Sequence, residues 1–317
     1  MFVIMEIKLV TYNIDGLPEQ LDLRQLPWVL RPLARLYRLV NGTYIVRVND
    51  NDGVAGKIAE MSRRLAELKP DIIAVQEDFN YHRELLSGLT GYGCGSHTGG
   101  ITFRNVRWSP YPRCKADGLG LLVRQDMVMM DDERIVPWRK SHGYFTHAND
   151  RLTQKGFRRY TVTVGDCVEI DVYVVHMDAD FYHPILRPDV NKDVAARRAQ
   201  LQQLTEYIIA RYDEGNDRPA IIMGDTNCNY GYEWDKELIE YYLRLPLHVH
   251  RSLQVAEGEG KYNVGSVDRL FVVNNYCSRY WLRIKSSLPD KSFKGLSDHL
   301  PLVGEIEIGQ RFKDLKD

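Results

Sequence analysis

The chain has 317 residues, of which 44% are hydrophobic, and its formal net charge is −1. This length and composition are typical of a globular α/β protein with a large core. The near-neutral charge argues against a protein that grips nucleic acid along its whole length, because such proteins usually carry a basic surplus. Five widely spaced cysteines without a CxxC pair predict neither a disulfide framework nor a cysteine zinc site.

The N-terminal stretch "MFVIMEIKLVTYN" predicts a first strand and not a signal peptide. It lacks a basic n-region and a long apolar h-region, and no run in the chain reaches membrane-spanning length. We therefore expect a soluble, cytoplasmic protein, unless a leader has been removed.

Apolar runs, some of them alternating with polar residues, predict strands throughout the chain. In chain order these strands are expected at 6–12, 71–76, 119–124, 158–164, 168–175, 219–223, 267–273 and 301–308. Apolar residues at helical spacing predict helices at 54–68, 190–212 and 233–243. We expect one α/β domain over 1–317, with sheets packed face to face, helices outside and an insertion at about 18–53.

Polar side chains stand at the ends of several predicted strands. They are Asn13, Glu77, His176, Asp225, Asn227, Asp268, Asp298 and His299. Asp and Asn also favour turns, so any one of these positions has an ordinary alternative explanation. Taken together, and placed at one edge, they supply hard oxygen ligands for Mg²⁺ or Mn²⁺ together with two imidazoles.

The motifs "TYNIDGL", "DIIAVQE", "VVHMDAD", "IIMGDTN", "VDRLFV" and "LSDH" occur in the order found in the endonuclease/exonuclease/phosphatase superfamily. The sequence resembles this superfamily from residue 7 to residue 307. Its members include DNase I-like nucleases, neutral sphingomyelinases and inositol-phosphate phosphatases. The resemblance implies a DNase I-like, four-layer α/β sandwich of two mixed sheets, and Mg²⁺-dependent hydrolysis of phosphoric esters.

The resemblance also implies roles for the oxygen-bearing residues. Glu77 is expected to be the principal metal-binding carboxylate, with Asn13 and Asp298 completing or steadying the metal site. Asp225 is expected to orient or deprotonate the attacking water, and Asn227 to help hold the phosphate.

Three further positions carry roles in the superfamily. His299 matches the catalytic imidazole, and Asp268 matches the acid that fixes its tautomer. His176 matches a second imidazole, which donates to a phosphate oxygen. Asp117, just before a predicted strand, is a candidate substrate-facing residue.

Three functions remain open at this level. The first is a phosphodiesterase acting by direct water attack on a small or lipid-derived phosphoester; the "KG" of "KGFRRYTVTV" resembles the sphingomyelinase-like branch, and the histidine of "VVHMDAD" resembles the DNase I, sphingomyelinase and inositol-phosphatase branches more than the abasic-site nucleases. The second is an endonuclease or exonuclease acting on DNA or RNA. The third is a non-catalytic binding module, which the presence of every expected carboxylate and imidazole disfavours. No obligate protein partner is evident.

The insertion contains a basic amphipathic segment at 28–40, in which Arg31, Arg35 and Arg38 share a helical face. Such a segment could make peripheral contact with an anionic membrane or with a phosphate backbone. The alternative is a surface helix that packs its leucines on the sandwich. The aromatic residues Trp108, Trp138 and Tyr144 could shape a pocket or belong to the core, and we assign no role to His97, His142 or His147.

Overall fold

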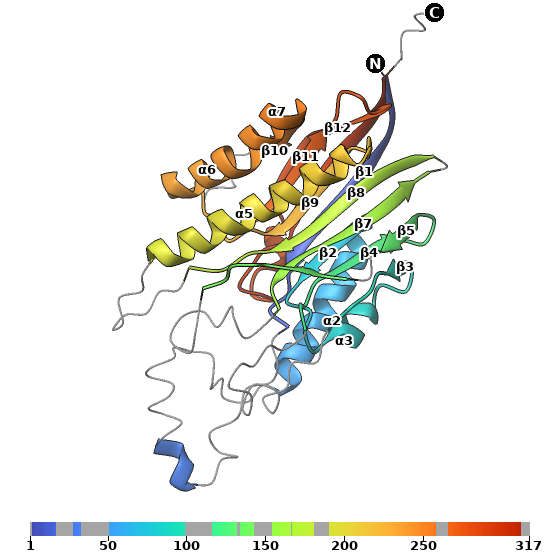
Figure 1. Ribbon diagram of the computed structural model, residues 1–317. Coiled ribbons are helices and arrows are strands. Elements are labelled where there is room, and N and C mark those ends of the chain that lie inside the picture. The colour runs from blue at the N-terminus through green and yellow to red at the C-terminus, as the bar shows by residue number, and fades with distance from the viewer. Residues whose placement is uncertain are drawn as a thin grey trace, which may run out of the picture.

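The computed structural model describes residues 2–16, 28–32, 51–98, 116–131, 134–142, 154–165, 167–180, 190–257 and 266–311. Two sheets stack in the middle of the molecule, with one group of helices on each outer side (Figure 1). This arrangement confirms the predicted four-layer α/β sandwich.

The first sheet has six strands in the order β12-β13-β1-β2-β4-β3. Their bounds are β1 (Phe2–Asn13), β2 (Ile72–Gln76), β3 (Tyr92–Cys94), β4 (Gly120–Arg124), β12 (Tyr280–Pro289) and β13 (Leu302–Gln310). Strands β1 and β2 are parallel, and the other pairs are antiparallel, so the sheet is mixed as expected.

The second sheet follows the order β10-β11-β9-β8-β7-β5, and β6 pairs with β7. Its strands are β5 (Val128–Asp131), β6 (Val136–Pro137), β7 (Gly156–Val164), β8 (Val168–His176), β9 (Ala220–Asp225), β10 (Gln254–Glu257) and β11 (Asp268–Asn274). Here the parallel pair is β8 with β9.

The central strands are buried on both faces, which explains their continuous apolar runs. In β2, Ile72 and Ala74 point into the core between the two sheets, whereas Ile73 and Val75 pack under the helices of the first sheet. A sheet exposed to water on one side would instead require polar residues at alternate positions.

Helices α2 (Asn51–Leu68) and α3 (His82–Leu86) lie on the outer side of the first sheet (Figure 1). Helices α5 (Val190–Asp213), α6 (Glu233–Ile239) and α7 (Leu245–Arg251) lie on the outer side of the second. Among the described residues, no helix is long and apolar enough to cross a membrane.

The predicted helix at 233–243 is too short. A π-helical stretch, η3 (Glu240–Arg244), joins α6 directly to α7, so helical structure continues to Arg251. Pro246 favours an end to the helix in the sequence, but it lies just after the π-helical stretch, and helical structure continues through it.

Helix α2 begins at Asn51, at the end of the insertion expected at about 18–53. Residues 28–30 form a short 3-10 helix, η1 (Trp28–Leu30). Most of the basic segment at 28–40 lies outside the described residues, including Arg35 and Arg38, and so do Trp108, Tyr144 and His147.

The topology brings many strand ends to the same edge of the sandwich. Strands β1, β2, β8 and β9 run in parallel pairs and end there. Strands β11 and β13 are antiparallel to β9 and β1, so they begin at that edge. The N- and C-terminal ends of the described chain lie together at the opposite edge, where Phe2 pairs with Gln310 (Figure 1).

Candidate active site

Three predicted site residues form one row across the second sheet. His176 at the end of β8 is in register with Asp225 at the end of β9, and Asp225 is in register with Asp268 at the start of β11. Neighbouring strands are about 4.8 Å apart, so this register alone makes the three side chains neighbours. Motifs that are far apart in the sequence therefore converge through strand pairing.

An amide from the first sheet joins the carboxylates of both sheets. Asn13 Nδ2 donates to Glu77 Oε1 and to Asp225 Oδ2, each at 3.1 Å. Its Oδ1 accepts the backbone N–H of Asp15 at 3.1 Å. The nitrogen of Asn13 thus faces the carboxylates, and its oxygen, the atom that could bind a metal, is turned toward the backbone of Asp15.

The backbone at these strand ends adopts unusual conformations. Glu77 and Asn227 have φ of +58° and +52°, values at which a residue with a side chain is strained. Gly224, directly before Asp225, has φ of +141°, and a Cβ there would lie 2.1 Å from the carbonyl oxygen of Val175. This close approach explains why the motif "GDTN" requires its glycine.

His299 and Asp268 form an acid–imidazole pair. Asp268 Oδ2 accepts from His299 Nδ1 at 2.8 Å, and Asp268 is buried. Burial works against the charge of His299, but Asp268 outweighs it and holds the pKa of His299 well above its ordinary value. Burial raises the pKa of Asp268. Of the two nitrogens of His299, Nε2 remains to face the site.

The second imidazole, His176, is buried and lies between two carboxylates. Its Nε2 is 3.7 Å from Glu77 Oε1 and 3.6 Å from Asp225 Oδ2. These distances exceed hydrogen-bond length and are too short to hold a water molecule between the groups. Burial, reinforced by the nearby charge of Lys155, keeps the pKa of His176 well below its ordinary value, so its imidazole is neutral.

Asp225 lies at the centre of the group. Its Oδ2 is 3.8 Å from His299 Nε2, and its Oδ1 accepts the backbone N–H of Asn227 at 2.9 Å. Burial would raise its pKa, but neighbouring positive charge, chiefly that of His299, outweighs burial and leaves the pKa below its ordinary value. Asp225 is therefore ionised.

Asn227 is held by backbone contacts. Besides the bond from its N–H to Asp225, its Nδ2 donates to the carbonyl oxygen of Met177 at 2.9 Å. The amide nitrogen is thus engaged within the protein, where the sequence predicts that Asn227 helps to hold a phosphate.

Glu77 fits a divalent cation. Its carboxylate is half-buried, and burial raises its pKa to about 7 despite the opposing charge of Lys155 and the hydrogen bond from Asn13. Together with Asp225 it offers hard oxygen atoms of the kind that Mg²⁺ binds, and a bound cation would offset the cost of burying its charge.

Within this group of strand-end residues, Asp225, Asp268 and His299 have ligand atoms that all lie within 4.8 Å of one another. This set differs from the predicted metal set of Asn13, Glu77 and Asp298. In this set Asp268 and His299 form a hydrogen bond with each other, and we interpret the two as an acid–imidazole pair.

Asp298 and Asp117 differ from the other predicted residues. The Asp298 side chain is 67% exposed, and its Oδ1 lies 4.0 Å from His299 Nε2. Asp117 is fully buried, and its carboxylate accepts two hydrogen bonds from Arg158, at 3.1 and 2.7 Å. These contacts direct Asp117 toward the interior, although the sequence makes it a candidate substrate-facing residue.

Three contributors are assigned no role by the sequence. Lys155, of the "KG" dipeptide, is buried, and its Nζ donates to the carbonyl oxygen of Met177 at 3.0 Å. The hydroxyl of Ser297, within "LSDH", donates to the carbonyl oxygen of Asn13 at 2.8 Å and accepts the N–H of His299 at 3.1 Å.

The third is Trp138, a buried core residue whose indole N–H donates to the carbonyl oxygen of His176 at 2.7 Å. This placement agrees with the core alternative for that tryptophan. The dipeptide and the motif could have drawn attention to Lys155 and Ser297, whereas nothing in the sequence connects Trp138 with His176.

Solved structures with the same fold share little sequence with this chain. A humanized TDP2 of D. rerio has a TM-score of 0.55 and 13% identity, covering 95% of this chain and 98% of that one. A beta toxin variant from Staphylococcus aureus with bound magnesium ions has a TM-score of 0.56 and 15% identity, covering 95% and 99%.

A third structure, an endonuclease/exonuclease/phosphatase family protein from Bacteroides thetaiotaomicron, has a TM-score of 0.56 and 15% identity, covering 96% and 95%. No curated protein matches the chain by sequence. The sequence profile of the Endonuclease/Exonuclease/phosphatase family matches residues 10–299. The chain therefore belongs to the endonuclease/exonuclease/phosphatase family of metal-dependent phosphoric ester hydrolases.

Proposed function

We propose that the chain is a Mg²⁺-dependent phosphodiesterase that hydrolyses a small or lipid-derived phosphoester by direct attack of water. The observation that supports this most is the meeting of Glu77, His176, Asp225 and His299 at one edge of both sheets, each within 4 Å of another. These nitrogen–oxygen distances exceed hydrogen-bond length, so the facing atoms can still form hydrogen bonds with a ligand. Mn²⁺ would suit the same oxygen ligands.

Asp225 accepts a proton from the attacking water. It is ionised, and the N–H of Asn227 fixes the orientation of its carboxylate. We assign Asn227 to the positioning of Asp225, because its described contacts are made within the protein.

The imidazoles stabilise the charge that develops as the bond from phosphorus to the leaving oxygen breaks, and protonated His299 donates a proton to that oxygen. His299 carries a positive charge supported by Asp268, and His176 donates through a neutral N–H. Donors held in place before the reaction lower the barrier, since they need not reorganise as charge builds up.

Glu77 is the proposed principal ligand of the metal. A bound Mg²⁺ supplies a Lewis acid that polarises the phosphoryl group. Asn13 holds the carboxylate of Glu77 beside that of Asp225. Asp298 adds negative charge at the exposed rim of the site. The positive charge of Lys155 partly compensates the negative charge of the buried Glu77.

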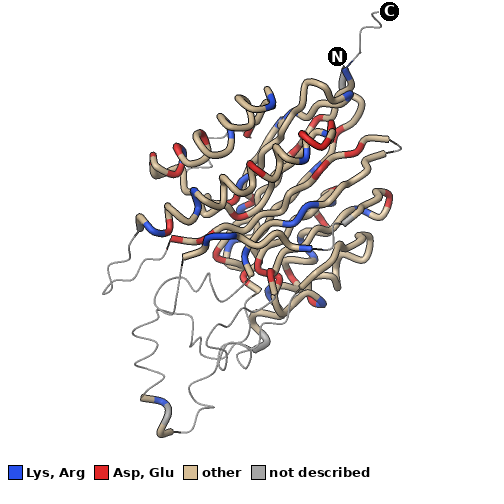
Figure 2. Tube along the Cα trace, in the orientation of Figure 1, with Lys and Arg blue, Asp and Glu red and all other residues tan. Residues whose placement is uncertain are grey.

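Two substrate classes follow from this chemistry. Acidic and basic residues are interspersed over the helices and sheets (Figure 2), which favours a compact phosphoester over a long polyanion. The alternative is a nuclease, because a D. rerio TDP2 solved with a single strand DNA product has the same fold, with a TM-score of 0.54 and 12% identity.

Catalysis is tested with Glu77→Gln and Asp268→Asn. We expect Glu77→Gln to abolish Mg²⁺-stimulated hydrolysis of a chromogenic diester. Asp268→Asn should lower kcat by roughly 10²- to 10⁴-fold with little change in KM, since it removes the support of a charged imidazole. His142→Ala is the matched control, because His142 also pairs with a buried aspartate, Asp193, through Nδ1 at 2.5 Å. Near wild-type hydrolysis by Glu77→Gln would exclude the proposed site.

The substrate is tested with a panel of sphingomyelin, phosphoinositides, nucleotides and a chromogenic diester, beside plasmid and single-stranded DNA. Each reaction is run with Mg²⁺ and again after chelation. Efficient Mg²⁺-dependent cleavage of DNA alone would replace the phosphodiesterase proposal with the nuclease.

A further inference from the structure

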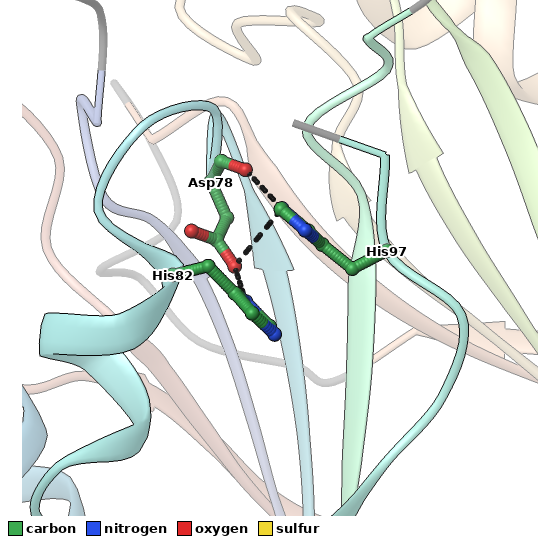
Figure 3. A group of neighbouring side chains, drawn as sticks. All are labelled: Asp78, His82 and His97. Atoms are coloured by element: carbon green, nitrogen blue, oxygen red, sulfur yellow. Dashed lines mark hydrogen bonds and ion pairs between the residues drawn. The ribbon is translucent and has the colours of Figure 1, made fainter. Parts of the chain in front are cut away.

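A second cluster of ligand-type side chains lies beside the catalytic group, on the first sheet. It comprises Asp78, the residue after Glu77; His82, the first residue of α3; and His97, which follows β3 (Figure 3). The described contacts of these side chains are with one another and with Cys94. The proposed catalytic role of the chain uses none of them.

The donor atoms of the three side chains lie close enough together to reach one ion after a small rearrangement. His82 Nδ1 is 2.5 Å from Asp78 Oδ2, and His97 Nε2 is 3.5 Å from the same oxygen. All three ligand atoms lie within 4.8 Å of one another. Around a tetrahedral zinc ion with bonds of about 2.0–2.2 Å, ligand atoms are roughly 3.3 Å apart. The distance from His97 Nε2 to Asp78 Oδ2 is close to that value, whereas the distance from His82 Nδ1 to Asp78 Oδ2 is that of a hydrogen bond and must lengthen when an ion binds.

The second carboxylate oxygen of Asp78 provides an independent observation. Asp78 is fully buried, and within the described part of the chain its Oδ1 has no hydrogen-bond partner. A buried carboxylate oxygen without a partner is costly, because it has lost its water and gained nothing in return. A cation bound to this carboxylate would compensate part of that cost by neutralising its charge.

The other nitrogen of His82 also has a partner. Its Nε2 lies 3.7 Å from Cys94 Sγ, on the side of the ring away from Asp78. Histidines that bind a metal through one nitrogen usually donate the other N–H to a fixed acceptor, which sets the ring orientation. Cys94 supplies such an acceptor when His82 binds through Nδ1.

We propose that Asp78, His82 and His97 form a zinc-binding site, separate from the catalytic metal site at Glu77. One carboxylate oxygen and two imidazole nitrogens suit Zn²⁺, whereas Mg²⁺ prefers oxygen ligands alone. Water would complete the coordination. The cysteine pattern of the sequence points away from a zinc site, but this site uses no cysteine as a ligand.

Zinc binding requires a local rearrangement. The rings of His82 and His97 are stacked, with centroids 3.9 Å apart and an interplanar angle of 5°. An ion lies near the plane of each imidazole that binds it, so two parallel rings cannot both point at one ion. At least one ring must turn, and His97 must exchange its bond to the backbone oxygen of Asp78 for the metal.

The proposed ion would hold together segments that meet beside the catalytic group. Asp78 continues the strained turn at Glu77, and its N–H donates to the carbonyl oxygen of Gly118 at 3.0 Å. His97 belongs to the segment that follows the edge strand β3. Zinc would therefore stabilise the turn that carries Glu77 without taking part in hydrolysis.

The test measures how many zinc ions each molecule of the full chain binds. Metal-free protein is saturated with Mg²⁺ and titrated with Zn²⁺ against a chromophoric chelator. We expect wild-type protein and the His142→Ala control to bind one more equivalent of zinc than His82→Gln or His97→Gln. Affinity at this site should fall by more than the roughly 10- to 100-fold typical of losing an outer-shell partner. Circular dichroism establishes that each variant is folded.

A second measurement needs no variant. X-ray absorption of the wild-type protein loaded with one equivalent of zinc should show two imidazole ligands and oxygen, without sulfur. Equal zinc stoichiometry in wild type and in both glutamine variants would overturn the proposal, as would sulfur in the zinc coordination shell. Failure of phosphodiester hydrolysis would leave these zinc measurements unaffected.

Discussion

Replacing Asp117 with asparagine separates a structural role from a substrate-binding role. Asp117 Oδ2 accepts from Arg158 Nε and Nη2 and from Thr98 Oγ1 at 2.7 Å, while Oδ1 accepts the N–H of Leu119 at 2.8 Å. Asp117 and Arg158 are both buried. The asparagine keeps the size of the side chain but leaves the guanidinium without its counter-charge.

The expected loss follows from this burial. Removing one partner of a buried ion pair costs about 3–5 kcal/mol, chiefly because the remaining charge is uncompensated. Unfolding entropy of about 2.1 cal/mol/K per residue gives roughly 0.67 kcal/mol/K for 317 residues. We therefore expect Asp117→Asn to lower Tm by about 4.5–7.5 °C.

Calorimetry and denaturant unfolding measure this loss, and diester hydrolysis per folded molecule is measured below the transition. The structural role predicts nearly unchanged KM and kcat. Arg158→Met should destabilise to a similar extent, and the double variant Asp117→Leu/Arg158→Met should lose less than the sum of the single variants. An unchanged Tm with a raised KM would refute the reasoning and restore Asp117 as a substrate-facing residue.

Two other features lead to separate predictions. Gly224→Ala should destabilise the fold by at least about 3 kcal/mol in denaturant unfolding, because its Cβ would meet the backbone of Val175. Gly215 also has a positive φ of +94°, but a Cβ built there would meet no neighbouring atom within 4 Å. Gly215→Ala should therefore lower the free energy of unfolding by clearly less, and equal losses in the two variants would contradict the steric argument. Burial raises the pKa of Cys228 to about 12, so at pH 8 its thiolate fraction is roughly a thousandfold below that of an ordinary cysteine. In native protein, mass spectrometry should find exposed Cys277 alkylated and Cys228 unmodified, and early alkylation of Cys228 would contradict its burial.

Each of the eight predicted strands is present, and each lies between two other strands of its sheet. Residues buried on both faces form continuous apolar runs, as in β2 and β9, and such runs can be recognised without a partner strand. The ten-residue strand β12 was not predicted, because exposed and buried positions mix along it and its register with β13 shifts between Ile284 and Ser286. Its structure depends on pairing with β13, which local sequence does not encode.

The types of side chain in the candidate site could also be predicted, but the contacts between these side chains could not. Strand-tip motifs identified Asn13, Glu77, Asp225 and His299 one by one. The direction of the Asn13 amide, with its nitrogen toward both carboxylates, depends on atoms contributed by two different sheets. His97 received no role, since only folding brings it to Asp78.

The sequence by itself determined the layered α/β architecture, the family and the set of carboxylates and imidazoles, because these depend on periodicity and on short motifs along the chain. Tertiary structure decided which of those groups are buried, charged or engaged by neighbours. Burial and electrostatic environment arise from residues distant in sequence, and so the opposite pKa shifts of His176 and His299 follow from strand register and packing.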